Sequence, residues 1–248
     1  MTRKDGKVYG RGSVDMKEFV ASILSAAGKV LGQKLRTPPH LPLVCIVGEP
    51  TGLAVTTCHK GKLAARVRFM GRAGHSALAL FLVNALYLAN EFIIALRDVQ
   101  VHLHASGVQD ADYDVSYTTL HVGRISSGGS LSAVPHHCES DFEIRHLAQD
   151  DPQKILQRLR DVARNIAAAA QNIAPEANIE IEVFNTYPGL DTPPAAAVVG
   201  FMKPLTEANG SCKVAMALRA ACLIKGWACR RWFVVSRIWR RGISQMSL

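Results

Sequence analysis

Four segments of the chain are predicted to be strands from their pattern of apolar and polar residues. They are residues 62–70, 117–125, 137–145 and 177–184. In the first, charged Arg66 and Arg68 alternate with apolar neighbours, a period of two that places successive side chains on opposite faces of a strand. A serine- and glycine-rich turn at residues 126–130 joins the second and third segments, which predicts a hairpin.

Two segments with helical spacing lie between these strands. The first runs from Leu82 to about Val99, and the second covers residues 150–171, where Asp150 and Asp151 are candidate caps ahead of a first-turn proline. The order strand, helix, strand, strand, helix, strand predicts a ferredoxin-like split βαβ arrangement. Its expected core is Ala65, Phe69, Phe142, Ile144, Ile155, Leu159, Ile179 and Ile181.

This compact unit, residues 57–187, is flanked by residues 1–56 and 188–215, which show no sheet pattern of their own. The flanks are interpreted as two parts of a second domain into which the middle unit is inserted. The expected fold class is therefore α/β, with a mixed, helix-flanked sheet in the outer domain. Residues 216–248 form a tail of different composition.

The composition indicates a globular protein. A chain of 248 residues buries a sizeable core, and its six cysteines lie far apart, which points to free thiols in a reducing compartment. The first 20 residues carry no secretory leader, so a cytoplasmic location is expected. Residues 77–96 are apolar, but Asn84, Asn90 and Glu91 interrupt them and argue against membrane insertion.

Most of the formal net charge of +9 comes from residues 213–248, which include the tail. Residues 213–248 hold eight basic residues, no acidic residue and all three tryptophans, whereas the rest of the chain has 21 basic and 20 acidic residues. Such a tail would suit nucleic acid, with cations on phosphates and aromatics on bases. A shifted reading frame produces the same composition without selection, so no nucleic-acid partner is expected.

Asp15 is the first candidate for chemistry. It follows Gly10 and Gly12 on a predicted strand-to-helix turn, where open α/β sheets place functional residues. A helix N-cap is the alternative role for the same carboxylate.

Four motifs occur in a characteristic order: "GRGSVDMK", "IVGEPTG", "HKGKLAARV" and "GRAGHSA". With these motifs around a split βαβ unit, the sequence resembles the dinuclear zinc amidohydrolases, which include acetylornithine deacetylase, succinyl-diaminopimelate desuccinylase, aminoacylase and carboxypeptidase G. The wording "DMK", "GEPTG" and "DFEIR" is most similar to the acetylornithine deacetylase branch, with the desuccinylase as the alternative. The resemblance implies a zinc-peptidase catalytic domain, two zinc ions or cobalt, an N-acyl amino acid substrate, and a homodimer through residues 57–187.

The resemblance also assigns roles to four residues. Asp15 matches the carboxylate that bridges the two metals, and Glu49 matches a terminal metal ligand, with a surface acid at a strand end as its alternative. His75 matches a lid histidine that reaches the partner subunit's active site and stabilises the oxyanion, or it is satisfied within its own turn. Arg145 matches a residue that holds a substrate carboxylate, or it is a cation on the strand surface. His59 is expected to be structural.

The sequence departs from the family at several points. The family's first histidine ligand lies in a segment before "GRG", and its adjacent Glu-Glu pair, which supplies the general base, has no match before "GEPT". Leu41 and Pro42 therefore look like the edges of a deletion, and Ser132 replaces a usual asparagine. Synonymous codons for residues 216–223 can be chosen so that another reading frame gives a segment expected of the family, and a frameshift near residue 215 would explain the composition of the tail.

The sequence suggests two alternative functions. The resemblance implies a hydrolase by descent that removes an acyl group from an amino acid, and activity of the chain in this form is not expected. The alternative is a non-catalytic dimerisation module, the remnant of a pseudogene, in which the middle domain pairs through an edge strand and a helix.

Overall fold

The computed structural model describes residues 2–4, 7–9, 21, 24–25, 29, 44–47, 54–206, 211–215 and 231–234. The chain divides into two compact units. Unit 1 comprises Met1–His59, Leu190–Val214 and Leu218–Leu248. Unit 2 comprises Lys60–Gly189 and Ala215–Ala217.

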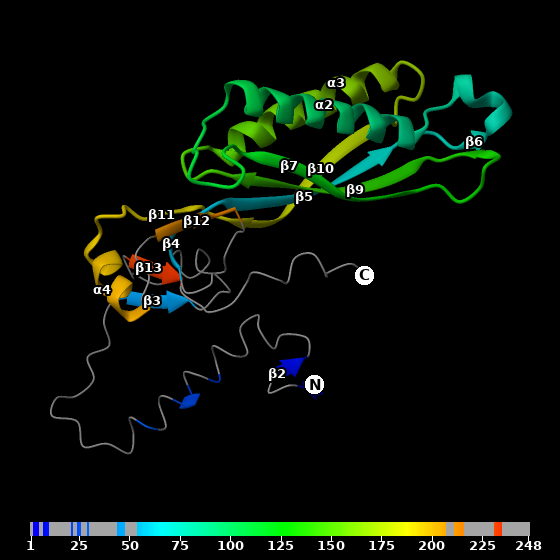
Figure 1. The fold of residues 1–248 in the computed structure, drawn as a ribbon. Coiled ribbons are helices and arrows are strands. Elements are labelled where there is room, and N and C mark those ends of the chain that lie inside the picture. Colours follow the sequence, from blue (N-terminus) through cyan, green and yellow to red (C-terminus); the bar gives the residue numbers. More distant parts are fainter. Residues whose placement is uncertain are drawn as a thin grey trace. The chain divides into compact units, whose positions relative to one another are not determined.

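Unit 2 is built on a sheet of four strands in the order β10-β5-β9-β7 (Figure 1). The strands are β5 (Gly61–Met70), β7 (Thr119–Ser127), β9 (His137–His146) and β10 (Asn178–Tyr187). Every neighbouring pair is antiparallel. Strand β9 lies between β5 and β7, which are joined through a helix. Strand β5 likewise lies between β9 and β10, which are joined through the other helix. This is the predicted split βαβ arrangement.

Two helices cover one face of this sheet: α2 (Ala85–Ser106) and α3 (Pro152–Gln171) (Figure 1). Helix α3 begins as predicted, because Asp151 accepts a hydrogen bond from the Gln153 N–H at 2.9 Å and Pro152 occupies the first turn. Helix α2 begins later and ends later than expected. Asn84 caps the start of the helix by accepting a hydrogen bond from the Leu86 N–H. The helix continues past Val99 to Ser106, where Gly107 is the C-cap.

The core of unit 2 lies between the helices and the sheet. Phe92 of α2 contacts Phe69 of β5 and Phe142 of β9, with ring centroids 5.7 and 6.0 Å apart. All eight core residues expected from the sequence lie in or against this cluster, although Ile179 and Ile181 of the edge strand β10 are only partly buried. Burial of this apolar face is the main force that stabilises the unit.

The opposite face of the sheet is a lattice of charges. Acidic residues of β9 alternate with its core residues and face basic residues of β5 in register. Ion pairs between strands on this face include Lys62–Glu143 at 2.8 Å, Arg66–Asp141 at 2.8 Å and Arg68–Glu182 at 2.7 Å. Opposite charges therefore face each other at Arg66–Asp141 and Arg68–Glu139, whereas Lys62 faces Arg145 and both contact Glu143.

Unit 1 contains a five-stranded mixed sheet in the part that the structure describes. Strand β4 (Val55–His59) pairs antiparallel with β11 (Leu190–Asp191) and parallel with β12 (Ser211–Val214). Strand β13 (Arg231–Val234) pairs parallel with β3 (Val44–Val47) and antiparallel with β4.

Two further strands and one helix complete the described elements of unit 1. Strand β1 (Thr2–Lys4) pairs with β2 (Lys7–Tyr9), and α4 spans Ala197–Thr206. The unit's strands have two to five residues, too short for a period of two to stand out in the sequence. Among the described helices, none has the length and apolar character needed to cross a bilayer.

Candidate functional site

Two of the four predicted site residues, Asp15 and Glu49, lie outside the described residues. Within the described part of the chain, no three His, Cys, Asp or Glu side chains gather into a group that could hold a metal. The predicted zinc ligands therefore stay a prediction, and the described geometry concerns His75, Arg145 and their surroundings.

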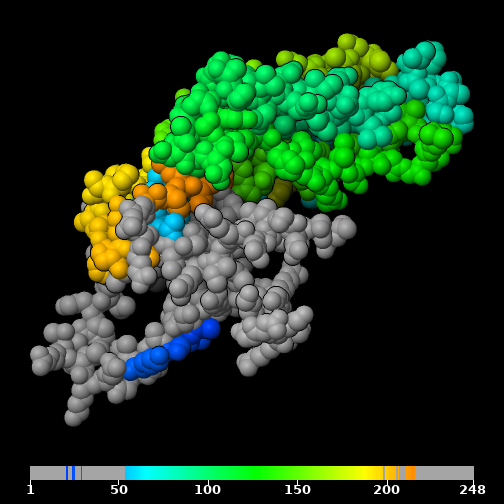
Figure 2. Space-filling view, in the orientation of Figure 1, coloured from blue at the N-terminus to red at the C-terminus, as the bar shows by residue number. Residues whose placement is uncertain are grey.

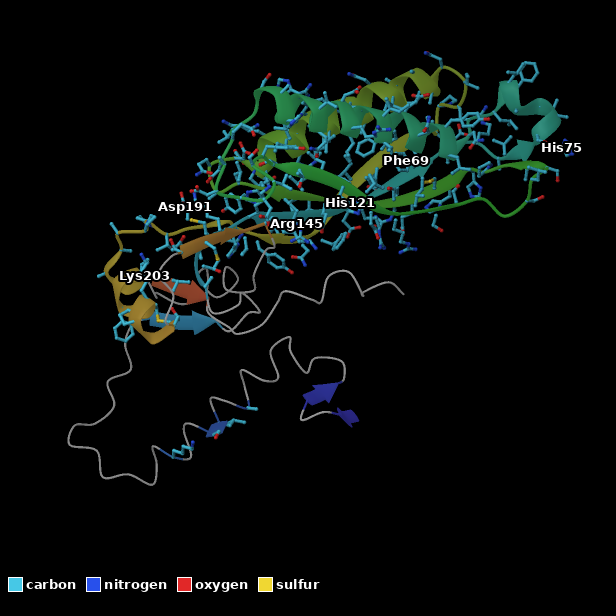
Figure 3. The ribbon with its side chains drawn as sticks, in the orientation of Figure 1. Phe69, His75, His121, Arg145, Asp191 and Lys203 are labelled. Carbon is cyan, nitrogen blue, oxygen red and sulfur yellow. The ribbon has the colours of Figure 1, made fainter. Side chains whose placement is uncertain are left out.

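His75 lies at one end of unit 2 (Figure 3). It ends the short strand β6 (Gly74–His75), pairs with Ala133 of β8 (Ala133–Val134), and caps the 3-10 helix η1 (Ser76–Phe81). Its Nδ1 accepts a hydrogen bond from the Ala77 N–H at 3.2 Å, and the side chain is exposed. Because Nδ1 accepts, Nε2 carries the proton of the neutral ring and is the donor.

The loop that carries His75 is tied to the β8 segment by backbone hydrogen bonds. Ser76 N donates to Ser132 O at 2.9 Å, and Gly71 N donates to His136 O at 2.8 Å. Ser132 shares a hydrogen bond with Ser130 at 3.1 Å. The two segments of this end, coloured teal and green, lie together in the ribbon and space-filling views (Figures 1 and 2).

Arg145 lies on the charged face of β9 and is already paired. Its Nε donates to Glu143 Oε1 at 2.8 Å and its Nη2 to Glu143 Oε2 at 3.2 Å. Burial alone would raise the pKa of Glu143, but hydrogen bonds from Arg145 and Lys62 outweigh it and lower the pKa. A substrate carboxylate at Arg145 therefore competes with an ionised glutamate in a bidentate pair.

His75 and Arg145 are at opposite ends of the sheet (Figure 3). Arg145 pairs with Lys62 near the start of β5, whereas His137, at the far end of β9, pairs with Met70 at the end of β5. The eight steps along β9 from His137 to Arg145 span about 27 Å of strand. One copy of unit 2 does not bring the two predicted site residues together.

A cavity of about 570 Å³ opens at the end of unit 2 that carries His75. Its polar lining includes Arg124 and Ser126 of β7, His137 and Glu139 of β9, and the turn around Gly128. The sequence pattern marked this turn only as a hairpin connection. The arginine two residues before the turn was the available signal, and it was missed.

Comparison with known proteins identifies the middle of the chain. Residues 57–171 match the family model described as the peptidase dimerisation domain. This match covers the strands, helices and cavity of unit 2 up to the end of α3.

Several solved structures share the fold. The aminopeptidase PepT of Bacillus cereus aligns with a TM-score of 0.59 and 16% identity over 77% of this chain and 48% of its own. A tripeptidase of Staphylococcus aureus aligns with a TM-score of 0.58 and 13% identity, over 77% of this chain and 48% of its own. An amidase of the hydantoinase/carbamoylase family from Burkholderia vietnamiensis gives 0.58 and 17%, over 78% and 46%. This chain therefore spans about half the length of the structures it matches.

Proposed function

We propose that this chain, which carries at residues 57–171 a peptidase dimerisation domain of the M20 peptidase family, is by descent a zinc-dependent amidohydrolase and in its present form a dimerisation module. The descent is supported by the domain match, by the four ordered motifs, and by the fold shared with aminopeptidase and amidase structures. For the ancestral reaction we propose removal of the acyl group from an N-acyl amino acid, with N-acetylornithine ahead of the N-succinyl substrate.

The residues that remain fit parts of such a reaction. Asp15 and Glu49 would hold the metal, which supplies a polarised water for attack on the amide carbonyl. His75 accepts a hydrogen bond at Nδ1 and therefore has Nε2 available as a donor at an exposed end of unit 2, which suits a group that stabilises a developing oxyanion. Arg145 would orient the substrate carboxylate only after exchanging its glutamate partner.

The separation of His75 from Arg145 supports action as a dimer. Because a single unit 2 holds them at opposite ends of its sheet, a site that uses both takes His75 from one copy and Arg145 from another. The same requirement explains why a dimerisation domain would carry active-site residues.

The single observation that carries the dimerisation proposal is the edge strand β7. Among the described strands it pairs only with β9, which leaves its outer backbone groups open to a second strand. The other edge, β10, carries Glu180 and Glu182, whose charges oppose pairing with an identical strand. Strand β7 has a single charged side chain, Arg124, and an isoleucine at its end, Ile125, that is 49% exposed.

Helix α2 continues this surface. It contacts β7 in unit 2 and exposes Ile94 and Val101, which lie seven residues apart on one stripe of the helix. Two copies related by a two-fold axis would join their sheets through β7 and bury the apolar side chains of α2 against each other.

Sedimentation equilibrium of the full chain tests this interface. We expect a dimer for the unmodified chain and a dissociation constant raised at least about tenfold by Ile125→Lys, because the substitution buries a charge at the joined edge. Phe184→Lys is the matched control, since Phe184 is 56% exposed on the opposite edge strand β10. A monomeric chain, or equal weakening by both variants, would reject β7 as the dimer edge.

A further inference from the structure

Arg124 lines the cavity at the His75 end of unit 2 and lies near two acids without a hydrogen bond to either. The nearest acidic atoms to the Arg124 guanidinium are Asp141 Oδ2 at 3.8 Å and Glu139 Oε1 at 3.9 Å. Both distances exceed hydrogen-bond length, and the side chain is 58% exposed. Arg124 therefore keeps donors for a ligand within the part of the chain that the structure describes.

The two acids near Arg124 are held by a different arginine. Arg66 donates to Asp141 through Nε at 2.8 Å and Nη2 at 3.0 Å, and its Nε lies 3.4 Å from Glu139. The hydrogen bond from Arg66 lowers the pKa of Asp141 and keeps it ionised. Arg66 therefore carries the hydrogen bonds to Asp141, while Arg124 interacts with these two acids only at 3.8–3.9 Å and keeps its N–H groups free of a hydrogen bond to either.

The backbone beside Arg124 is also open. Gly128 has φ of 83° in the left-handed region, and no atom lies within 4 Å of the position that a Cβ would take on Gly128 or Gly129. Backbone N–H groups in such turns are common parts of anion sites. The Ser127 hydroxyl donates to His137 O at 2.7 Å, which holds the turn against β9.

We propose that this cavity binds a small anion, a carboxylate or a phosphate, with the Arg124 guanidinium as its main donor and the Gly128–Gly129 turn as its second wall. Arg145 cannot be the donor to this anion in the same copy, because it is hydrogen-bonded to Glu143 at the opposite end of the sheet. The proposal does not depend on hydrolase descent, since only the geometry of unit 2 enters it.

Titration of the ¹⁵N-labelled full chain with sodium acetate and with sodium phosphate, at constant ionic strength, tests the site through the amide signals of Gly128 and Gly129. We expect a saturable shift with at least one anion, and the anion that binds more tightly identifies the chemistry. Arg124→Gln should weaken that binding about tenfold, the loss of one charge-assisted hydrogen bond.

The matched control is Arg68→Gln, because Arg68 also lies near Glu139, at 3.7 Å, but does not line the cavity. The anion affinity of Arg68→Gln should lie within twofold of that of the unmodified chain. Arg124→Lys should retain most of the affinity, which would show that the loss in Arg124→Gln is not caused by unfolding. Absence of a saturable shift with both anions, or equal weakening in the Arg124→Gln and Arg68→Gln variants, would overturn the proposal.

Discussion

At the scale of single residues, Gly61 shows how the absence of a side chain shapes the start of unit 2. Its register partner His146 is 5% exposed, and its Nδ1 lies 2.9 Å from Leu147 O. A Cβ on residue 61 would lie 2.1 Å from His146 Nε2 and 2.8 Å from the Gly189 backbone nitrogen. The glycine of "HKGK" is therefore required by packing, whatever the motif's ancestry.

We predict that Gly61→Ala lowers the free energy of unfolding by about 1–3 kcal/mol, because the methyl group overpacks a site closed by backbone. Urea unfolding followed by circular dichroism measures the change. Gly129→Ala is the control, since nothing lies within 4 Å of its Cβ position, and its effect should stay below about 0.5 kcal/mol. Equal midpoints for the two variants would show that the His146 ring moves aside freely.

At the scale of elements, an ion pair links two turns that are far apart in the sequence. Arg72, which follows β5, donates to Glu176, which precedes β10, through Nε at 2.7 Å and Nη2 at 2.6 Å. A third bond from Arg72 reaches Ile173 O at 3.0 Å. The pair therefore attaches the loop that leads to His75 to the end of α3.

This pair predicts a specific pH dependence. The hydrogen bond from Arg72 lowers the pKa of Glu176 from 4.5 to about 2. Because the folded-state pKa is lower, the carboxylate stabilises the fold fully above about pH 4.5 and loses this effect as the pH falls towards 2. Glu176→Gln should therefore melt below the unmodified chain at pH 7, and the difference should shrink below pH 4.5.

Thermal melting at pH 7, 4 and 2.5 checks this expectation. Glu180→Gln serves as the control, because Glu180 lies on the same edge of the sheet without an ion pair among the described residues. A melting difference for Glu176→Gln that is the same at all three pH values would contradict the assigned pKa.

At the scale of the whole molecule, the chain retains the domain that would pair two copies more completely than the parts that would perform chemistry. Residues 16–48 contain a single glutamate, Glu18, so the sequence offers no adjacent Glu-Glu pair for a general base before "GEPT". The structure describes the four-stranded sheet of unit 2 in full, whereas Asp15 and Glu49 lie outside its described residues.

We predict no measurable hydrolysis of N-acetylornithine by the purified chain with zinc or cobalt added. A missing general base alone costs roughly 100- to 10,000-fold in rate. Release of ornithine, measured by chromatography, checks this directly. Turnover near one per second that disappears in Asp15→Ala would show that the chain supplies its base from a residue we have not identified.

The sequence alone determined the architecture of unit 2, because local periodicity and strong caps coincide there. Alternation along residues 62–70 and 137–145 specified which side chains of β5 and β9 are buried, and Asp151 with Pro152 specified where α3 begins. The motif order predicted a zinc-amidohydrolase ancestry, and the match of residues 57–171 to a peptidase dimerisation domain agrees with its coarser part. The five-stranded sheet of unit 1 was not predicted, because its strands are short and most of their pairing partners are distant in the chain.

Only the tertiary structure decided how the candidate site residues relate. Sequence motifs name His75 and Arg145 together, yet strand register separates them by the length of the sheet. Register also decided how two of the arginines are engaged: Arg66 faces Asp141, whereas Arg124, beside a bulge in β7, stays beyond hydrogen-bond length of both its acidic neighbours. Such pairings depend on which strands become neighbours, a non-local property that no period along the chain encodes.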